Sequence, residues 1–175
     1  RGYGGWRGEY WLRWEGERLA VHGVDGMAAR ALADEPQLLA RRLPGVPILV
    51  GAHRDRTGRL ACDQFGADTV ILDDGFQHRR LARDCEIVLI HARMPFGGWA
   101  VLPRGPMREP LSSLRRADVV IMTKADEALE TIGALTERLR AFNREAVLAT
   151  ASHAPTALVD ALTGECCPLT RLEGA

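Results

Sequence analysis

Two pairs of adjacent carboxylates are the residues best suited to acid, base or metal chemistry. Asp73 and Asp74 follow an apolar run at residues 69–72 and precede Gly75. A carboxylate just after a strand of an open α/β sheet lies at the edge where ligands bind, and its oxygen atoms suit Mg²⁺. Asp-Gly is also a common turn dipeptide, so this pattern leaves a magnesium site and a plain turn equally open.

The second pair, Asp34 and Glu35, stands directly before Pro36 in a segment with helical periodicity at residues 26–43. Proline disfavours helical backbone in the residue before it, so we expect a helix break near Glu35 with both acids at that boundary. A carboxylate near magnesium can take a proton from a hydroxyl as a general base. A solvated acidic break is the alternative interpretation.

His78 lies four residues after Asp74 and is followed by Arg79 and Arg80. With Asp73 and Asp74 it could form a three-ligand metal site and thus a small metal-dependent hydrolase, although a structural histidine is commoner. The arginines could bind phosphate through two parallel hydrogen bonds, or they could begin a solvated helix.

The T-K-A-D segment at residues 123–126 partly matches the N-K-x-D base-reading loop of GTPases, but a helix N-cap at Asp126 explains it equally well. Its Lys124 is the only lysine of the sequence, and no G-x-x-x-x-G-K-[ST] phosphate loop contains it. The G-x-S-x-G, H-E-x-x-H and G-x-G-x-x-G motifs are also missing. We therefore expect these residues by themselves not to transfer phosphate.

An alternation of apolar and helical segments must position these side chains. Unalternated apolar runs, typical of strands covered on both faces, lie at residues 46–50, 69–72, 86–90, 118–122 and 146–149. Helices are expected at residues 52–65, with Gly58 inside, and at residues 126–142, where one face carries Leu129, Ile132, Leu135 and Leu139. This order predicts an α/β fold with a parallel sheet and flanking helices.

Three further segments complete the expected organisation. Residues 9–22 read as a small β-hairpin, and a weaker hairpin surrounds Thr163 and Gly164. Residues 93–113 form a long Pro/Gly-rich loop whose apolar content argues against disorder. We expect residues 1–151 to form the central part of one α/β domain and residues 152–175 to start an incomplete C-terminal extension.

Composition excludes several classes of protein. The 175 residues are 46% hydrophobic and 26% charged, as in globular proteins, and the 23 basic and 23 acidic residues cancel. Without a positive field, we expect no nucleic-acid partner. No apolar stretch of about 18 residues occurs. The four cysteines form no C-x-x-C pair and are expected to be reduced thiols.

Four motifs in the same order resemble the signature of the tetraacyldisaccharide 4′-kinases, the lipid A 4′-kinases. They are R-G-Y-G-G at residues 1–5, D-E-P at 34–36, D-D-G-F-Q-H with R-L-A-R-D at 73–84, and P-F-G with L-P-R-G-P-M-R-E at 95–109. In that family the phosphate loop lies before R-G-Y-G. The resemblance therefore implies a central fragment, inactive in isolation.

The resemblance also implies a P-loop-kinase-like fold and the transfer of the ATP γ-phosphate, with Mg²⁺, to the 4′-hydroxyl of a tetraacyldisaccharide 1-phosphate. The reaction would take place at the cytoplasmic face of the bacterial inner membrane. Asp34 would be the base and Asp73 the Walker-B-like acid. The implied site residues are catalytic Asp34, Asp74 and His78, metal-holding Asp73 and Glu35, and lining Tyr3, Gln77 and Arg108. The metal-dependent hydrolase and a non-catalytic interaction module remain the alternatives.

Overall fold

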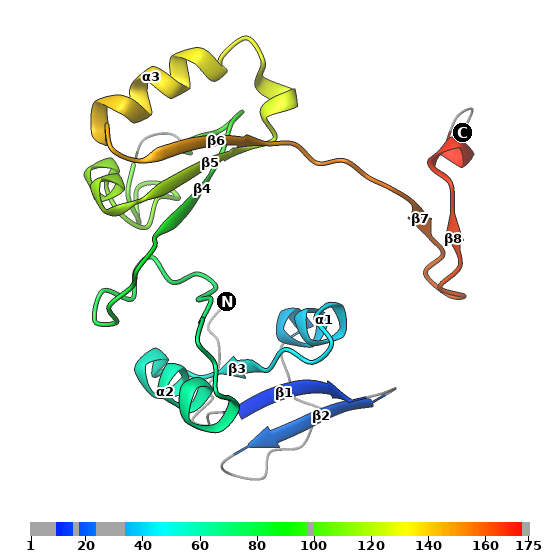
Figure 1. Cartoon of the computed structure of the whole chain (residues 1–175). Helices are drawn as coiled ribbons and strands as arrows, with labels where there is room; N and C mark the ends of the chain where they lie inside the picture. Colours follow the sequence, from blue (N-terminus) through cyan, green and yellow to red (C-terminus); the bar gives the residue numbers. More distant parts are fainter. Residues whose placement is uncertain (1–9, 16–17, 24–33, 98–99, 173–175) are drawn as a thin grey trace. The chain divides into compact units, whose positions relative to one another are not determined.

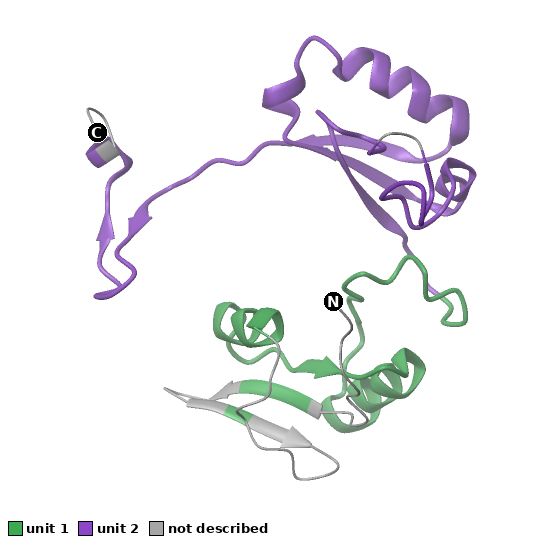
Figure 2. Cartoon of the chain, turned by 180° about the vertical axis from the view of Figure 1, so that it is seen from behind, with its two compact units in different colours: residues 1–82 green, residues 83–175 purple. Residues whose placement is uncertain are grey.

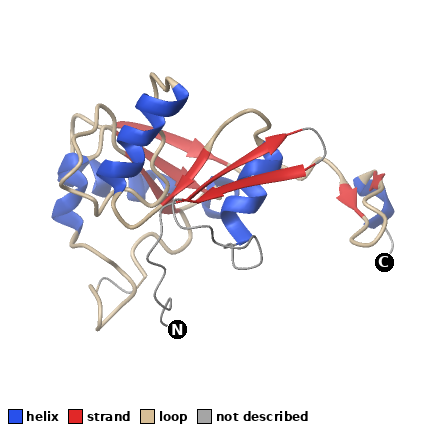
Figure 3. Cartoon of the chain, turned by 90° about the horizontal axis from the view of Figure 1, so that it is seen from below, coloured by secondary structure: helices blue, strands red, loops and turns tan. Residues whose placement is uncertain are grey.

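The computed structural model describes residues 10–15, 18–23, 34–97 and 100–172, and the chain divides into two compact units, residues 1–82 and 83–175 (Figure 2). The fold class is α/β, as predicted, with a parallel sheet flanked by helices and two small antiparallel hairpins (Figure 3). No helix of the described residues has both the length and the apolar character needed to cross a membrane.

The first unit contains a three-stranded sheet in the order β2-β1-β3. Strands β1 (Tyr10–Glu15) and β2 (Arg18–Gly23) form the predicted hairpin. Strand β3 (Ile48–Val50) pairs antiparallel with β1, so it is not part of the parallel sheet that the sequence predicts for it. This pairing buries Leu12 of β1 completely against Ala40 and the flanking β3 side chains. Burial of apolar surface therefore accounts for the different partner.

Helix α1 (Asp34–Arg42) packs on this sheet and begins at the predicted acidic boundary. Its Pro36 lies in the first turn, where a missing N–H costs no helical hydrogen bond. The expected helical residues 26–33 lie outside the described residues. Helix α2 (Arg54–Phe65) ends at Gly66, whose φ of 61° is left-handed. At that end, the Phe65 ring meets Trp11 of β1 edge to face at 4.8 Å.

Residues 69–72 do not form the predicted strand. Val70 is 43% exposed and Ile71 92% exposed, and no described strand pairs with them. A strand is stable only when a neighbour accepts and donates its backbone hydrogen bonds. Residues 69–72 have the apolar, β-branched side chains typical of a strand but no neighbouring strand among the described residues to pair with, so the prediction was wrong here.

The second unit is built on a parallel sheet in the order β4-β5-β6 (Figure 1). Strands β4 (Ile87–His91), β5 (Val119–Thr123) and β6 (Val147–Ala151) confirm three predicted strands. Helix α3 (Ile132–Phe142) and the short 3₁₀-helix η2 (Leu111–Arg116) contribute the side chains that bury one face. Val120 and Leu139 are 1% and 2% exposed at the centre of that core.

The predicted helix at residues 126–142 is interrupted. A 3₁₀-helix, η3 (Ala125–Ala128), precedes α3, and Leu129 between them is 74% exposed, so it does not belong to the buried face. The Thr131 hydroxyl donates to the Ala128 carbonyl at 3.2 Å. Such local side-chain bonds compete with regular helix and explain the interruption.

Polar side chains tie the beginnings of the three strands together. The Asp118 carboxylate accepts the Glu86 backbone N–H at 2.7 Å, just before β4 and β5 begin. Asn143, after α3, donates its amide to the carbonyls of Leu114 and Ala117. Its side-chain oxygen accepts from the backbone N–H groups of the two residues before β6, Glu145 and Ala146.

The Pro/Gly-rich loop is ordered by close packing in its described part. Phe96 is 5% exposed, and Val101 pairs with Met107 in an isolated bridge. A Cβ on Gly105 would lie 2.4 Å from the Ala100 carbonyl oxygen, so only glycine fits there. Beyond β6, strands β7 (Leu158–Val159) and β8 (Cys166–Cys167) form the predicted second hairpin.

Candidate functional site

The acidic pair Asp34 and Glu35 occupies the first turn of α1, and both residues are exposed. The backbone N–H groups of a first helical turn carry partial positive charge, which makes acidic side chains favourable there. Their exposure leaves the oxygen atoms accessible to a hydroxyl or a cation. Asp34 and Glu35 therefore lie at the predicted helix boundary with both side chains exposed to solvent.

The second acidic pair lies in a tight turn. Asp74 has a φ of 50°, a left-handed conformation that a side chain with a Cβ rarely adopts. A Cβ on Gly75 would lie 2.8 Å from the Leu72 Cβ, so the following residue has to be glycine. The His78 backbone N–H donates to the Gly75 carbonyl at 2.9 Å and closes the next turn, residues 75–78. Strained turns of this kind are common at functional sites.

The side chains of this turn differ in exposure. Asp73, Asp74 and Gln77 are exposed, and His78 is half-buried. Asp74, Gln77 and His78 all make further interactions. Asp73 therefore presents an accessible carboxylate beside the left-handed backbone of Asp74.

A three-ligand metal site is not formed by Asp73, Asp74 and His78. Among the residues that the structure describes, no three His, Cys, Asp or Glu side chains gather closely enough to hold a metal ion. The spacing in sequence suggested such a trio, but the structure does not gather these three side chains into a ligand set. The metal-dependent hydrolase therefore loses the site on which it depended.

Arg108 belongs to the second unit and is exposed next to a well-ordered ion pair. The Arg116 guanidinium donates to both oxygens of Glu109, at 3.1 and 2.9 Å, and both side chains are largely buried. This pair ties the end of the Pro/Gly-rich loop to η2 and fixes the backbone beside Arg108. The remaining predicted site residue, Tyr3, lies outside the described residues.

A cluster of three charged side chains lies at the carboxyl ends of β4 and β5. The sequence pattern had drawn attention only to its Lys124, which was then set aside. Arg93 and Lys124 both contact the Glu127 carboxylate, at 3.3 and 3.5 Å. The Arg93 hydrogen bond is the main cause that lowers the pKa of Glu127. His91, the last residue of β4, stands in register with Thr123 of β5. The signal available in sequence was charged residues directly after two successive apolar runs.

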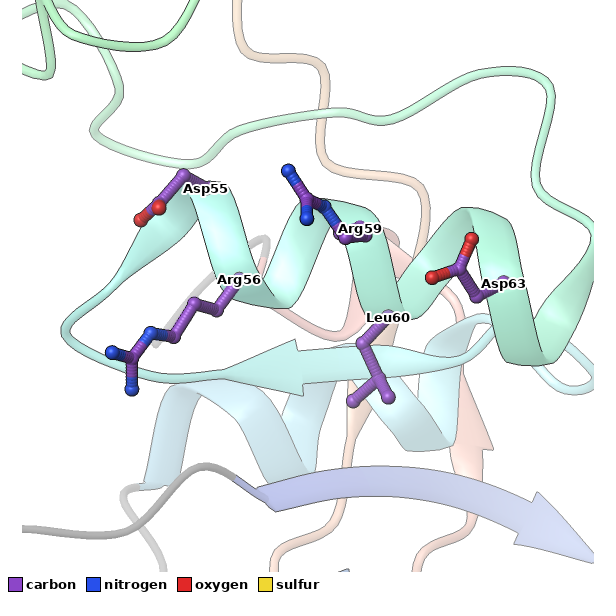
Figure 4. A pocket seen from close by; sticks show the side chains of 5 residues that line it. All are labelled: Asp55, Arg56, Arg59, Leu60 and Asp63. Atoms are coloured by element: carbon purple, nitrogen blue, oxygen red, sulfur yellow. The ribbon is translucent and has the colours of Figure 1, made fainter.

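A shallow depression also lies on α2, where none of the predicted site residues is found. Figure 4 shows Leu60 on one side of the helix and Asp55, Arg59 and Asp63 along another. Arg56 completes its lining. Acidic and basic side chains alternate along one helix face there, which is typical of a solvated surface.

Comparisons with known proteins agree on one family. The model of the family described as "Tetraacyldisaccharide-1-P 4'-kinase" matches residues 1–174. A tetraacyldisaccharide 4'-kinase of Anaeromyxobacter dehalogenans (strain 2CP-C) is 46% identical over 178 residues, which cover 99% of this chain and 44% of that protein. Another, from Syntrophus aciditrophicus (strain SB), is 48% identical over 125 residues, 70% of this chain and 32% of that protein.

A third relative with the same name, from Halothermothrix orenii (strain H 168), is 42% identical over 116 residues, 66% of this chain and 30% of that protein. The chain spans less than half the length of the curated relatives it matches. No solved structure matches the chain.

Proposed function

Because the chain belongs to the tetraacyldisaccharide-1-P 4'-kinase family, we propose that the protein transfers the γ-phosphate of ATP to the 4′-hydroxyl of a tetraacyldisaccharide 1-phosphate in lipid A biosynthesis. The match over residues 1–174 is the observation that carries this proposal. The ordered acidic turns add support, since phosphoryl transfer depends on positioned carboxylates rather than on covalent chemistry by the protein.

We assign the proton-accepting role to Asp34. Its carboxylate is exposed in the first turn of α1, and a base of this kind takes the hydroxyl proton of the acceptor sugar as the phosphoryl group is transferred. Asp74 and His78 are proposed as further catalytic groups. In support, Asp74 has a strained left-handed backbone of the kind that concentrates at functional sites, and His78 ends the turn that follows it.

Magnesium is the metal that this donor set suits. Asp73 and Glu35 offer exposed carboxylate oxygens, and Mg²⁺ is often bound by only one or two carboxylates together with substrate phosphates. We propose these two residues as its protein ligands. The ion would supply charge neutralisation at the transferred phosphate. Tyr3, Gln77 and Arg108 are proposed to line the substrate and nucleotide site.

We further propose that the reaction takes place at the cytoplasmic face of the bacterial inner membrane, because the acylated acceptor is a lipid. Residues 1–151 are proposed to belong to the catalytic α/β domain, and residues 152–175, which carry the β7-β8 hairpin, to an appended segment.

The proposal is tested with the purified product of the complete gene that encodes this chain. The assay follows transfer of labelled γ-phosphate from ATP to tetraacyldisaccharide 1-phosphate in detergent micelles. We expect Asp34→Asn to lower kcat by at least about 10²-fold, the low end for removal of a general base. Asp55→Asn is the matched control, because Asp55 is equally an exposed acid in the first turn of a helix but lies in no motif.

Two results would count against the proposal. Failure of the unaltered protein to phosphorylate this acceptor would remove the proposed activity. An active protein in which Asp34→Asn is silent would instead remove Asp34 as the base, and a silent variant is also the result expected of an interaction module.

A further inference from the structure

The backbone at Lys124 is strained. Its φ of 54° and ψ of 41° are left-handed, and among the described residues only Asp74 shares a positive φ without being glycine. This conformation brings the Cβ of an L-residue close to its own carbonyl oxygen, so glycine or asparagine is the favoured occupant. A long side chain in this position lowers stability, and such residues concentrate at functional sites.

The residue in this position is also unusual in the chain. Of the 23 Lys and Arg residues, Lys124 is the only lysine. Arginine offers a planar fork, whereas lysine offers a compact ammonium that binds phosphate as a point charge. The chain therefore places its one ammonium group where the backbone least favours a side chain.

The position within the fold is one that binds ligands in other α/β proteins. Lys124 follows directly after β5, the middle strand of the parallel sheet (Figure 1). In open α/β sheets, ligands bind beyond the carboxyl ends of the strands. The neighbouring strand β4 ends at His91, and the Ala92 backbone N–H donates to the Thr123 carbonyl at 2.9 Å, so both strand ends form one edge.

The charged groups at this edge are chiefly hydrogen-bond donors. The Arg93 backbone N–H donates to His91 Nδ1 at 3.2 Å, so a neutral His91 ring carries its proton at Nε2. Arg93 and Lys124 bring two permanent cations, and Glu127, which contacts both, holds them together as their shared counter-ion. Asp126, in the same short 3₁₀-helix, brings a second carboxylate, so the formal charges of these residues cancel. What the edge offers a ligand is the set of donors on Arg93, Lys124 and His91, which match an acceptor-rich group.

We infer that the carboxyl end of β4 and β5 is a phosphate-binding site, with Lys124 and Arg93 as its cationic ligands and the Nε2–H of His91 as a further donor. Glu127 is a positioning residue, because it acts through the two cations. This site does not depend on the proposed kinase activity. The phosphate could belong to a nucleotide, a sugar phosphate or an anionic lipid headgroup.

A single isotope label can test the site. Growth on [¹⁵N]lysine gives the 175-residue chain one labelled backbone amide, that of Lys124, because the sequence has one lysine. Inorganic phosphate is titrated against this signal, with sodium chloride at equal ionic strength as the reference. We expect a saturable shift with phosphate and none with chloride.

Arg93→Gln should weaken phosphate binding at least about 5-fold, consistent with loss of one charge-assisted hydrogen bond. Arg115→Gln, an exposed arginine in η2, should leave it unchanged.

Three further titrations identify the source of the phosphate. MgATP, glucosamine 1-phosphate and phosphatidylglycerol vesicles are compared with inorganic phosphate, and the tightest of them names the ligand class. Absence of a saturable shift with inorganic phosphate, or equal weakening by Arg93→Gln and Arg115→Gln, overturns the inference. Since no catalysis is measured, these outcomes are separate from those of the kinase assay.

A second variant separates a functional lysine from a structural one. Lys124→Gly relieves the left-handed strain, so we expect it to raise Tm by about 2–4 °C. Phosphate should raise the Tm of the unaltered chain by mass action more than that of the variant, which keeps only the general stabilisation by an excluded salt. A variant that keeps the full response to phosphate shows that Lys124 is not a phosphate ligand, and a less stable variant contradicts the backbone strain from which the inference starts.

Discussion

Replacement of Asn143 tests most directly whether polar side chains hold the strands and helices of the second unit together. The Asn143 side chain donates to the carbonyls of Leu114 and Ala117 at 2.9 and 2.8 Å. Its oxygen accepts the backbone N–H groups of Glu145 and Ala146 at 3.0 and 3.1 Å. One amide, placed just after α3, thus satisfies four backbone groups: two carbonyls at the end of η2 and two N–H groups just before β6.

Asn143→Ala removes all four hydrogen bonds. A net contribution of about 0.5–1.5 kcal/mol for each bond sets an upper range of about 2–6 kcal/mol. Asn143 is half-buried, so water can reach some of the released groups, and we expect a loss of about 2–3 kcal/mol. Asn143→Asp keeps the two accepted bonds but turns an ionised oxygen toward two carbonyls. We therefore expect it to be as destabilising at pH 7 and to recover in part as the new carboxyl is protonated in acid.

Native-state amide hydrogen exchange measures the effect where it arises. The free energy of opening should fall by the stated amount for amides of β5, α3 and β6, and should be unchanged in the first unit. Arg144→Ala is the control. The Arg144 side chain is exposed, and the backbone carbonyl that accepts a hydrogen bond from Arg140 is kept in the variant. A loss below about 0.5 kcal/mol for Asn143→Ala, the size of an ordinary surface substitution, would refute the reasoning.

Two other outcomes follow from local geometry. Gly58→Ala should stabilise α2 by about 0.5–1 kcal/mol in urea unfolding, because a Cβ at this position would meet nothing within 4 Å. Gly66→Ala should instead lower the stability of the chain, because Gly66 has a left-handed φ of 61°. Equal effects of the two variants would contradict this reasoning. Backbone hydrogen bonds from Thr163 and then Leu162 hold the pKa of Asp160 below its ordinary value of 3.8, so the β7-β8 hairpin gains stability above that value and loses it as pH falls through the lowered pKa. Carboxyl NMR titration measures that pKa, and Asp160→Asn should abolish the pH dependence of hairpin signals; an undisturbed titration would exclude the capping role.

Local patterns were sufficient to predict most strands and the acidic helix start. Unalternated apolar runs predicted β4, β5 and β6, whose buried side chains share one core with those of α3 and η2. Residues 69–72 have a similar pattern and yet form no strand, since pairing depends on a partner distant in sequence. Leu129 fitted a helical face that the Thr131 hydroxyl interrupts, which periodicity does not report.

In the candidate site, too, local patterns predicted some features, whereas others depend on the three-dimensional structure. Asp34 was predicted at a helix boundary and lies in the first turn of α1, whereas Asp73 was predicted at the end of a strand that residues 69–72 do not form. Sequence reasoning overestimated the gathering of His78 with the two aspartates, because spacing along a chain does not fix side-chain direction in a turn. Lys124 was set aside because T-K-A-D matches the GTPase loop only in part, and its left-handed backbone cannot be read from the sequence.

The polar ties before the strands have a consequence for how the parallel sheet chooses its alignment. In β4, Ile90 is 6% exposed whereas Ile87 and Leu89 are 53% and 65% exposed, so both faces of the strand are apolar. A slip of one residue would exchange similar side chains, and hydrophobic patterning alone therefore specifies the alignment weakly. Asp118 and Asn143, by contrast, each accept from particular backbone N–H groups that a slipped strand would carry out of reach. A few hydrogen bonds at the N-terminal ends of the strands thus select one alignment. Burial of apolar side chains alone would give the alignments shifted by one residue nearly the same free energy.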